Sequence, residues 1–212
     1  MFTLRTGSQA RAEITVKRSR FITTLMRTDT TEQARAAIAE VKREFPDARH
    51  NCSAFVIASQ QGPNRAHSSD DGEPSGTAGP PILEVLLGDS LVDVTAVVTR
   101  YFGGVLLGTG GLVRAYTDAT KAGVAVADLV ALRTLKKVEV RVPLKVAGRF
   151  ESEIHVRSWP VLESSWEEQL SLTLGLTEVE ADELALLTAE LTRRPAQLRD
   201  LGTTVVESPV SG

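Results

Sequence analysis

A glycine-rich segment, RYFGGVLLGTGGLVRAY at residues 100–116, contains residue types that can receive an anion. Five of its positions are glycine, and each glycine inside regular structure costs roughly 0.5–1 kcal/mol relative to alanine. This density indicates a special backbone conformation or the close approach of another group. The residues that follow have the pattern of a helix. When a strand, a flexible turn and a helix follow one another, the first amides of the helix point outward and can bind an anion.

The segment matches neither of the two standard phosphate-binding loops. A dinucleotide fingerprint needs G-x-G-x-x-G, but Val113 stands where the third glycine should follow Gly108 and Gly110. A Walker loop ends in Gly-Lys-Ser or Gly-Lys-Thr, and this segment contains no lysine. Two interpretations remain: a generic anion site at the amides of residues 110–113, or glycines that only permit tight packing and positive φ angles.

A second segment, SSDDGEPSGTAGPP at residues 68–81, is acidic and rich in turn-forming residues. Asp70, Asp71 and Glu73 lie within four positions, and Mg²⁺ favours one or two carboxylates together with phosphate oxygens. The D-x-D-x-D-G spacing of a calcium loop is absent. The alternative is a solvated turn, because Asp-Gly and Glu-Pro are common turn dipeptides.

Other candidate nucleophiles and ligands carry weaker patterns. His50 and Cys52 fall on one face of an expected strand, but two ligands do not make a zinc site, and a free cysteine in an apolar strand is usually a small core residue. Whether Cys52 and a histidine such as His67 are close enough for nucleophilic chemistry depends on the fold. The serines of residues 68–75 lie outside any G-x-S-x-G pattern, which argues against a serine hydrolase.

The elements that must position these segments follow from the hydrophobic periodicity. In the first half we expect one strand or a bent pair at 13–28, a helix at 28–45, a strand at 51–59, a long loop at 60–81, a helix ending near residue 88, a strand at 91–102 and a helix at 111–130. In the second half we expect a strand at 136–144, a helix at 146–156, a strand pair at 160–176, a helix at 177–194 and a final strand at 202–208. The order β-α-β-β-α-β of the second half predicts a ferredoxin-like sandwich.

Composition and charge narrow the class of protein. The chain has 212 residues, 42% of them hydrophobic and 24% charged, as in an ordinary globular protein. No apolar run approaches the ~20 residues of a membrane span, no export signal is evident, and the single cysteine suits a reducing cytoplasm. The net charge of −3 does not indicate a dedicated nucleic-acid binder. KRSR at 17–20 is either a local basic patch or an ordinary solvated strand.

Two long motifs, in this order and spacing, resemble the signature of the Impact/YigZ family: SDDGEPSGTAGPPIL at 69–83 and VVTRYFGGVLLGTGGLVRAY at 97–116. KRSRFI and HNCSAFV upstream are also similar, although Ser53 stands where an aromatic residue is expected. The resemblance spans roughly 14–125 and implies an α+β protein. It implies an N-terminal domain at 1–135 with the ribosomal-protein-S5 domain-2-like fold. The domain at 136–212 then resembles the last domain of translocation elongation factors.

The resemblance implies a place in translation, since eukaryotic relatives restrain activation of a starvation-responsive kinase of translation initiation. The leading hypothesis is therefore a cytoplasmic regulator without a cofactor or catalytic activity, which binds RNA, the ribosome or a protein partner away from membranes. The loops at 67–79 and 100–114 would form its surface. The residues expected there are Asp70, Asp71, Gly72, Glu73, Gly76, Thr77, Arg100, Tyr101, Gly103, Gly104, Gly108, Thr109, Gly110, Gly111, Arg114 and Lys121.

A rival hypothesis is an enzyme or sensor that binds a phosphorylated small molecule or nucleotide, with Mg²⁺, at the glycine-rich turn. Small-molecule kinases of the galactokinase type share the implied fold and place a glycine/serine loop over ATP phosphates, but fold analogy does not establish function. The missing lysine weakens this reading. A third possibility is a pure protein-interaction module. The sequence leaves the partner and the oligomeric state open.

Overall fold

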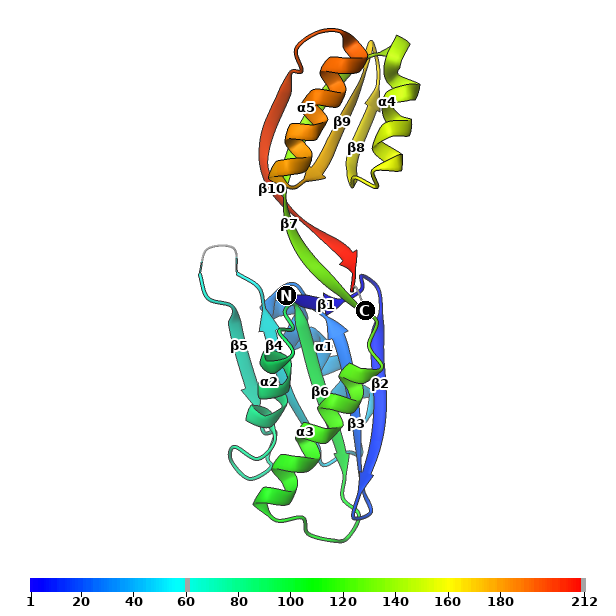
Figure 1. Ribbon diagram of the computed structural model, residues 1–212. Coiled ribbons are helices and arrows are strands. Elements are labelled where there is room, and N and C mark those ends of the chain that lie inside the picture. The colour runs from blue at the N-terminus through cyan, green and yellow to red at the C-terminus, as the bar shows by residue number, and fades with distance from the viewer. Residues whose placement is uncertain (60–61, 211–212) are drawn as a thin grey trace. The chain divides into compact units, whose positions relative to one another are not determined.

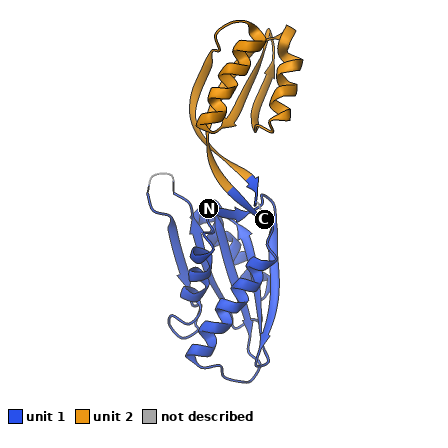
Figure 2. Cartoon of the chain, viewed as in Figure 1, with its two compact units in different colours: residues 1–131, 208–212 blue, residues 132–207 orange. Residues whose placement is uncertain are grey.

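The computed structural model describes residues 1–59 and 62–210 and has a mixed α+β architecture, with five helices and two sheets in that part of the chain (Figure 1). The chain divides into two compact units (Figure 2). Unit 1 contains residues 1–131 together with the C-terminal end from Ser208, and unit 2 contains Leu132–Glu207. None of the helices in the described ranges is long and apolar enough to cross a membrane.

Unit 1 is built on a five-stranded antiparallel sheet with the order β2-β3-β6-β4-β5. Its strands are β2 (Gln9–Val16), β3 (Ser19–Arg27), β6 (Val94–Tyr101), β4 (His50–Ile57) and β5 (Arg65–Ser69), and its helices are α1 (Thr31–Glu44), α2 (Gly79–Gly88) and α3 (Thr109–Ala125). A short strand, β1 (Phe2–Leu4), pairs outside this sheet with the start of β7 (Leu129–Pro143).

Helices cover both faces of the unit 1 sheet. On one face α3 packs on β2 and β3, and α2 packs on β4 and β5 (Figure 1). On the other face α1 packs on β4 and β6, where Ala34 and Ile38 contact Phe55 and Ile57. Because side chains alternate along a strand, the central strand β6 is buried on both faces, and its end at Arg100 points toward α3.

Unit 2 has the order β-α-β-β-α-β. Its elements are β7, α4 (Leu144–Val156), β8 (Val161–Trp166), β9 (Gln169–Leu176), α5 (Glu178–Thr192) and β10 (Leu198–Pro209). The strands lie in the order β10-β7-β9-β8, and both helices contribute to one core with Val140, Phe150, Leu172 and Leu184. A capping box at Thr177 begins α5.

The domain boundary at 135/136 stays a prediction, while the two compact units divide at 131/132 and the C-terminal end from Ser208 belongs to unit 1. The reason is that β7 is one continuous strand. Its first residues pair with β1, whereas Lys136–Pro143 pair with β9. Hydrophobic alternation along β7 does not change at the point where its pairing partner changes.

The long loop expected at 60–81 is wrong in part. Residues 65–69 form β5, and α2 already begins at Gly79, while residues 60–61 lie outside the described ranges. The β5 sequence RAHSS has little strand propensity, so its pairing with β4 provides the conformation. The segment expected as one strand or a bent pair at 13–28 is a hairpin, which turns at Lys17 and Arg18 with φ of 44° and 69°.

Candidate functional site

The carboxylate of Glu73 joins the two motif segments. Arg100 at the end of β6 places Nη1 2.6 Å from Glu73 Oε1, and the Tyr116 hydroxyl of α3 donates to the same oxygen at 2.8 Å. The side chains of Arg100 and Glu73 are only 8% and 4% exposed. The acidic loop, the central strand and α3 are thus connected by one buried ion pair and one hydrogen bond.

Two aromatic rings lie close to the Arg100 guanidinium. Its central carbon lies 5.4 Å from the ring centroid of Phe21 and 5.7 Å from that of Phe102. Nη2 lies 3.5 Å from Ser19 Oγ, and Nε is buried without a hydrogen-bond partner among the described residues. The position of this cation is therefore fixed by Glu73 and by packing.

The Cys52 thiol and the Tyr116 hydroxyl lie next to the ion pair, and burial favours the protonated form of both groups. The Cys52 sulfur is 3.0 Å from the carbonyl oxygen of Asp70 and 3.2 Å from the Tyr116 hydroxyl. Burial raises the pKa of the Cys52 thiol to about 12. Burial, followed by Cys52 and Glu73, also raises the pKa of Tyr116. Because the thiolate is the reactive form of cysteine, this thiol is a poor nucleophile at neutral pH.

Asp70 organises the loop that leads into α2. Its carboxylate accepts hydrogen bonds from the amides of Gly76, Ala78 and Gly79 at 2.8, 3.0 and 2.8 Å. Burial raises the pKa of Asp70, but these three amides outweigh it and hold the pKa below its ordinary value. Glycine is required at position 79, since a Cβ there would lie 2.8 Å from the backbone of Ser69.

Asp71 also points into the protein. Lys42 Nζ lies 2.5 Å from Asp71 Oδ1, the Asn51 amide donates to Oδ2 at 2.7 Å, and His50 Nδ1 lies 2.9 Å from the Asp71 carbonyl oxygen. All three carboxylates of the loop are thus engaged by protein groups. Across residues 1–59 and 62–210, no group of three or more His, Cys, Asp and Glu side chains is arranged to hold a metal ion.

The glycine-rich turn rests on the hairpin turn between β2 and β3. The Gly103 amide donates to Ser19 Oγ at 3.2 Å, and a Cβ at position 103 would lie 2.1 Å from the Arg18 backbone. Only glycine allows this approach. The same turn exposes Phe102, Val105 and Leu106, of which Leu106 is 83% exposed.

The structure brings some of the expected site residues together and separates others. Asp70, Asp71, Glu73 and Arg100 meet at one end of the sheet, but Tyr101 points to the opposite face, where the Arg20 guanidinium lies 5.5 Å from its ring centroid. The other expected residues are placed as follows: Thr77 is buried; Gly72, Gly76, Gly104 and Gly108 have positive φ; Thr109, Gly110 and Gly111 form the first turn of α3; Arg114 and Lys121 are exposed on α3.

Sequence reasoning missed Ser19, Phe21 and Phe102 as neighbours of Arg100. Phe21 falls in the segment expected as one strand or a bent pair at 13–28, but no local signal shows that β3 lies beside β6. The pairing of Phe21 with Arg100 depends on the register of these two strands, which are distant in sequence.

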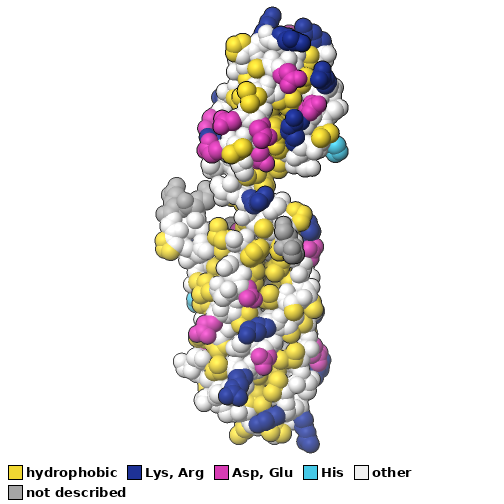
Figure 3. Space-filling model, viewed as in Figure 1, with side chains coloured by type: hydrophobic (Ala, Val, Ile, Leu, Met, Phe, Trp, Pro, Cys, Tyr) yellow, Lys and Arg dark blue, Asp and Glu magenta, His cyan; other side chains and the backbone are white. Residues whose placement is uncertain are grey.

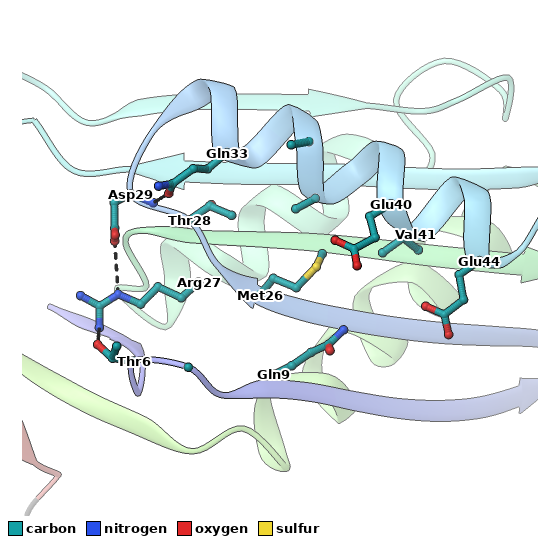
Figure 4. A pocket seen from close by; sticks show the side chains of 13 residues that line it. Thr6, Gln9, Met26, Arg27, Thr28, Asp29, Gln33, Glu40, Val41 and Glu44 are labelled. Carbon is teal, nitrogen blue, oxygen red and sulfur yellow. Dashed lines mark hydrogen bonds and ion pairs between the residues drawn. The ribbon is translucent and has the colours of Figure 1, made fainter.

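A hollow of about 560 Å³ lies apart from this cluster, between α1 and the strands β2 and β3 (Figure 4). Arg27 lies at one end, with its Nε 3.2 Å from Asp29 Oδ1 and its Nη1 3.0 Å from Thr6 Oγ1. The Asp29 amide donates to Gln33 Oε1 at 2.6 Å. None of the residues expected at the site lines this hollow.

Known proteins resemble this chain over nearly its whole length. The family model of the Impact N-terminal domain matches residues 17–124. IMPACT family member YvyE of Bacillus subtilis (strain 168) is 35% identical over 199 residues, covering 94% of this chain and 91% of that protein. An IMPACT family member of Haemophilus influenzae is 38% identical over 196 residues, covering 88% and 92%. A crystal structure described as that of a hypothetical protein has 33% identity and a TM-score of 0.58, covering 93% of this chain and 95% of its own.

These matches include the residues on which the resemblance was based. Both motifs, at 69–83 and 97–116, fall inside the range matched by the family model. The similarity to the Bacillus and Haemophilus proteins extends well beyond that range. The chain belongs to the IMPACT family.

Proposed function

We propose that this protein is a cytoplasmic, translation-associated regulator that binds RNA, the ribosome or a protein partner without catalysing a reaction. Its binding surface is formed by the loops at 67–79 and 100–114. The observation that carries the proposal is the buried Glu73 carboxylate, which links the acidic loop to Arg100 and Tyr116. One ion pair thereby fixes two distant motifs into a single preformed surface, as a recognition site requires.

The chemistry of the cluster supports binding over catalysis. Catalysis needs a reactive group that can reach a substrate. Here Cys52 is buried and protonated, and the carboxylates of Asp70 and Asp71 accept hydrogen bonds from backbone amides. The rival proposal, Mg²⁺ with a phosphorylated small molecule at the glycine-rich turn, would require carboxylates that leave these partners.

The groups that face outward suit an anionic partner. Gly108 has no side chain to cap the first amides of α3, and Arg114 and Lys121 follow on the same helix. The place in translation comes from the resemblance to the Impact/YigZ family. From the same resemblance we also assign unit 1 to the ribosomal-protein-S5 domain-2-like fold. We assign unit 2 to the ferredoxin-like fold because its elements follow the order β-α-β-β-α-β.

Sedimentation with purified bacterial ribosomes tests the proposal. We expect the wild-type chain to enter the ribosome pellet and an Arg114→Gln/Lys121→Gln variant to remain largely in the supernatant at the same salt concentration. The matched control is Lys145→Gln/Arg149→Gln, which removes two exposed cations from α4 of unit 2. Loss of binding in the control variant alone, or equal binding by all three proteins, would contradict the proposed surface.

A further inference from the structure

Cations without carboxylate partners gather at one end of unit 1. Lys17 and Arg18 occupy the turn between β2 and β3, and Arg114 lies near the start of α3. All three are exposed and none makes an ion pair with another described residue. Arg20, by contrast, is neutralised by Glu13, with Nε 2.8 Å from Oε1. The positive charge of this end is therefore available to a partner.

An exposed aromatic ring precedes Gly103, the residue that packs on the backbone of Arg18. Phe102 is 46% exposed, and the buried guanidinium of Arg100 lies 5.7 Å from its ring centroid. Part of the ring thus faces a fixed cation inside the protein while the rest faces solvent. Val105 and Leu106, in the same turn, add exposed apolar area beside it.

The two turns form one surface, because Gly103 packs directly on the backbone of Arg18 and donates to Ser19 Oγ. The glycine-rich turn leads directly into α3, which carries Arg114. We call the two turns together with Arg114 the tip surface and define it by Lys17, Arg18, Phe102, Val105, Leu106 and Arg114. The turns lie side by side in Figure 1, and Figure 3 shows hydrophobic and basic side chains at the corresponding end of unit 1.

The geometry points to single-stranded RNA as the ligand of the tip surface, with phosphates on Lys17, Arg18 and Arg114 and a base against Phe102. This inference rests on the proposed function and names its partner. Single strands are bound by combining cations that follow the backbone with aromatic rings on which bases stack. An acidic protein segment would use the same cations, but its carboxylates do not stack on an aromatic ring, whose face carries partial negative charge. A duplex buries its bases and cannot use the ring.

Fluorescence anisotropy with defined RNAs tests this on the full chain. The probes are 5′-labelled 12-nucleotide oligo(U) and oligo(A) and a duplex of the same length, each titrated at 50, 100 and 200 mM KCl. Contacts to three or four phosphates predict a slope of about −2 to −3 for log K against log salt concentration. We expect both single strands to bind more tightly than the duplex.

Variants separate stacking from charge. Phe102→Leu keeps an apolar side chain but removes the stacking face, and should weaken single-strand binding by about 5-fold or more without changing the salt slope. Lys17→Asn/Arg18→Asn keeps residues that tolerate positive φ and should reduce the slope by about 1.4. Arg35→Gln is the control, since Arg35 is exposed, makes no ion pair with another described residue and lies on α1, which follows the far end of β3.

Absence of binding by all three probes at 50 mM KCl would overturn the inference, as would wild-type affinity in both tip variants. Preference for the duplex would overturn it as well. If these RNAs fail to bind while ribosome sedimentation still depends on Arg114 and Lys121, the proposed function stands and the assignment of single-stranded RNA to the tip surface is wrong. If sedimentation fails too, both are wrong.

Discussion

Replacing Arg100 with methionine removes the cation from the buried ion pair and leaves an unbranched apolar side chain in its place. The two partners are 8% and 4% exposed, so the variant leaves the Glu73 carboxylate buried, with only the Tyr116 hydroxyl to stabilise it. Breaking a buried pair by removing one partner typically costs 3–5 kcal/mol. We expect Arg100→Met to lower the free energy of unfolding of unit 1 by about 3–5 kcal/mol.

The assay must follow unit 1 separately from unit 2. Both tryptophans, Trp159 and Trp166, lie in unit 2, so their fluorescence during urea unfolding reports that unit alone and serves as the internal control. Hydrogen exchange of the β6 amides reports the stability of unit 1. We expect Arg100→Met to accelerate exchange in β6 and to leave the tryptophan transition unchanged.

A double-mutant cycle supplies the refutation. The Arg100→Met/Glu73→Gln variant has no unpaired buried charge. Its loss of unfolding free energy should therefore be smaller than the sum of the losses in the two single variants by about 2 kcal/mol or more. The claim that this ion pair stabilises the acidic loop would be refuted by either of two results. The two single effects on the free energy of unfolding could add to the double effect within about 0.5 kcal/mol, or Arg100→Met alone could lower it by less than about 1 kcal/mol.

Three further substitutions or treatments test the surrounding geometry. Asp70→Asn should lower the stability of unit 1 by about 1–3 kcal/mol at pH 7. Folding lowers the pKa of Asp70, so its carboxylate stabilises the folded state fully above the unfolded pKa of about 3.9. This stabilisation is lost as the pH falls through the folded pKa. Urea titrations at pH 3 should therefore show a smaller stability difference between the wild type and Asp70→Asn than at pH 7. Gly103→Ala should lower the free energy of unfolding by about 1–3 kcal/mol, because the added Cβ meets the Arg18 backbone. Gly110→Ala is the control: its Cβ would have no atom within 4 Å, so thermal unfolding should show a neutral or stabilising effect. Cys52 should react with iodoacetamide at pH 8 about 10³ times more slowly in the folded than in the unfolded chain, and equal rates would show that its thiol is not buried and protonated.

The sequence predicted elements well where the signal is local. Periodicity and a capping threonine placed α1, and the acidic first turn placed α5. The two motif segments, with their glycines and acids, identified the family. These features depend on residues within a few positions of one another, which is the range that a sequence pattern reports.

The direction of the acidic side chains could not be predicted, because it depends on contacts between distant segments. From the sequence, Glu73 is either a Mg²⁺ ligand or part of a solvated turn, yet its partners are 27 and 43 residues away in the chain. Strand β5 has the composition of a loop and becomes a strand only because β4 pairs with it. The tip surface likewise depends on Gly103 meeting Arg18, two residues that no sequence pattern connects.

Hydrogen exchange of the full chain with and without bacterial ribosomes tests the proposed binding surface most directly. If the loops at 67–79 and 100–114 form that surface, peptides from both loops should exchange more slowly in the complex. Peptides from α4, at residues 144–156, should be unchanged. Protection confined to unit 2, or no protection at a ribosome concentration that sediments the protein, would contradict this account.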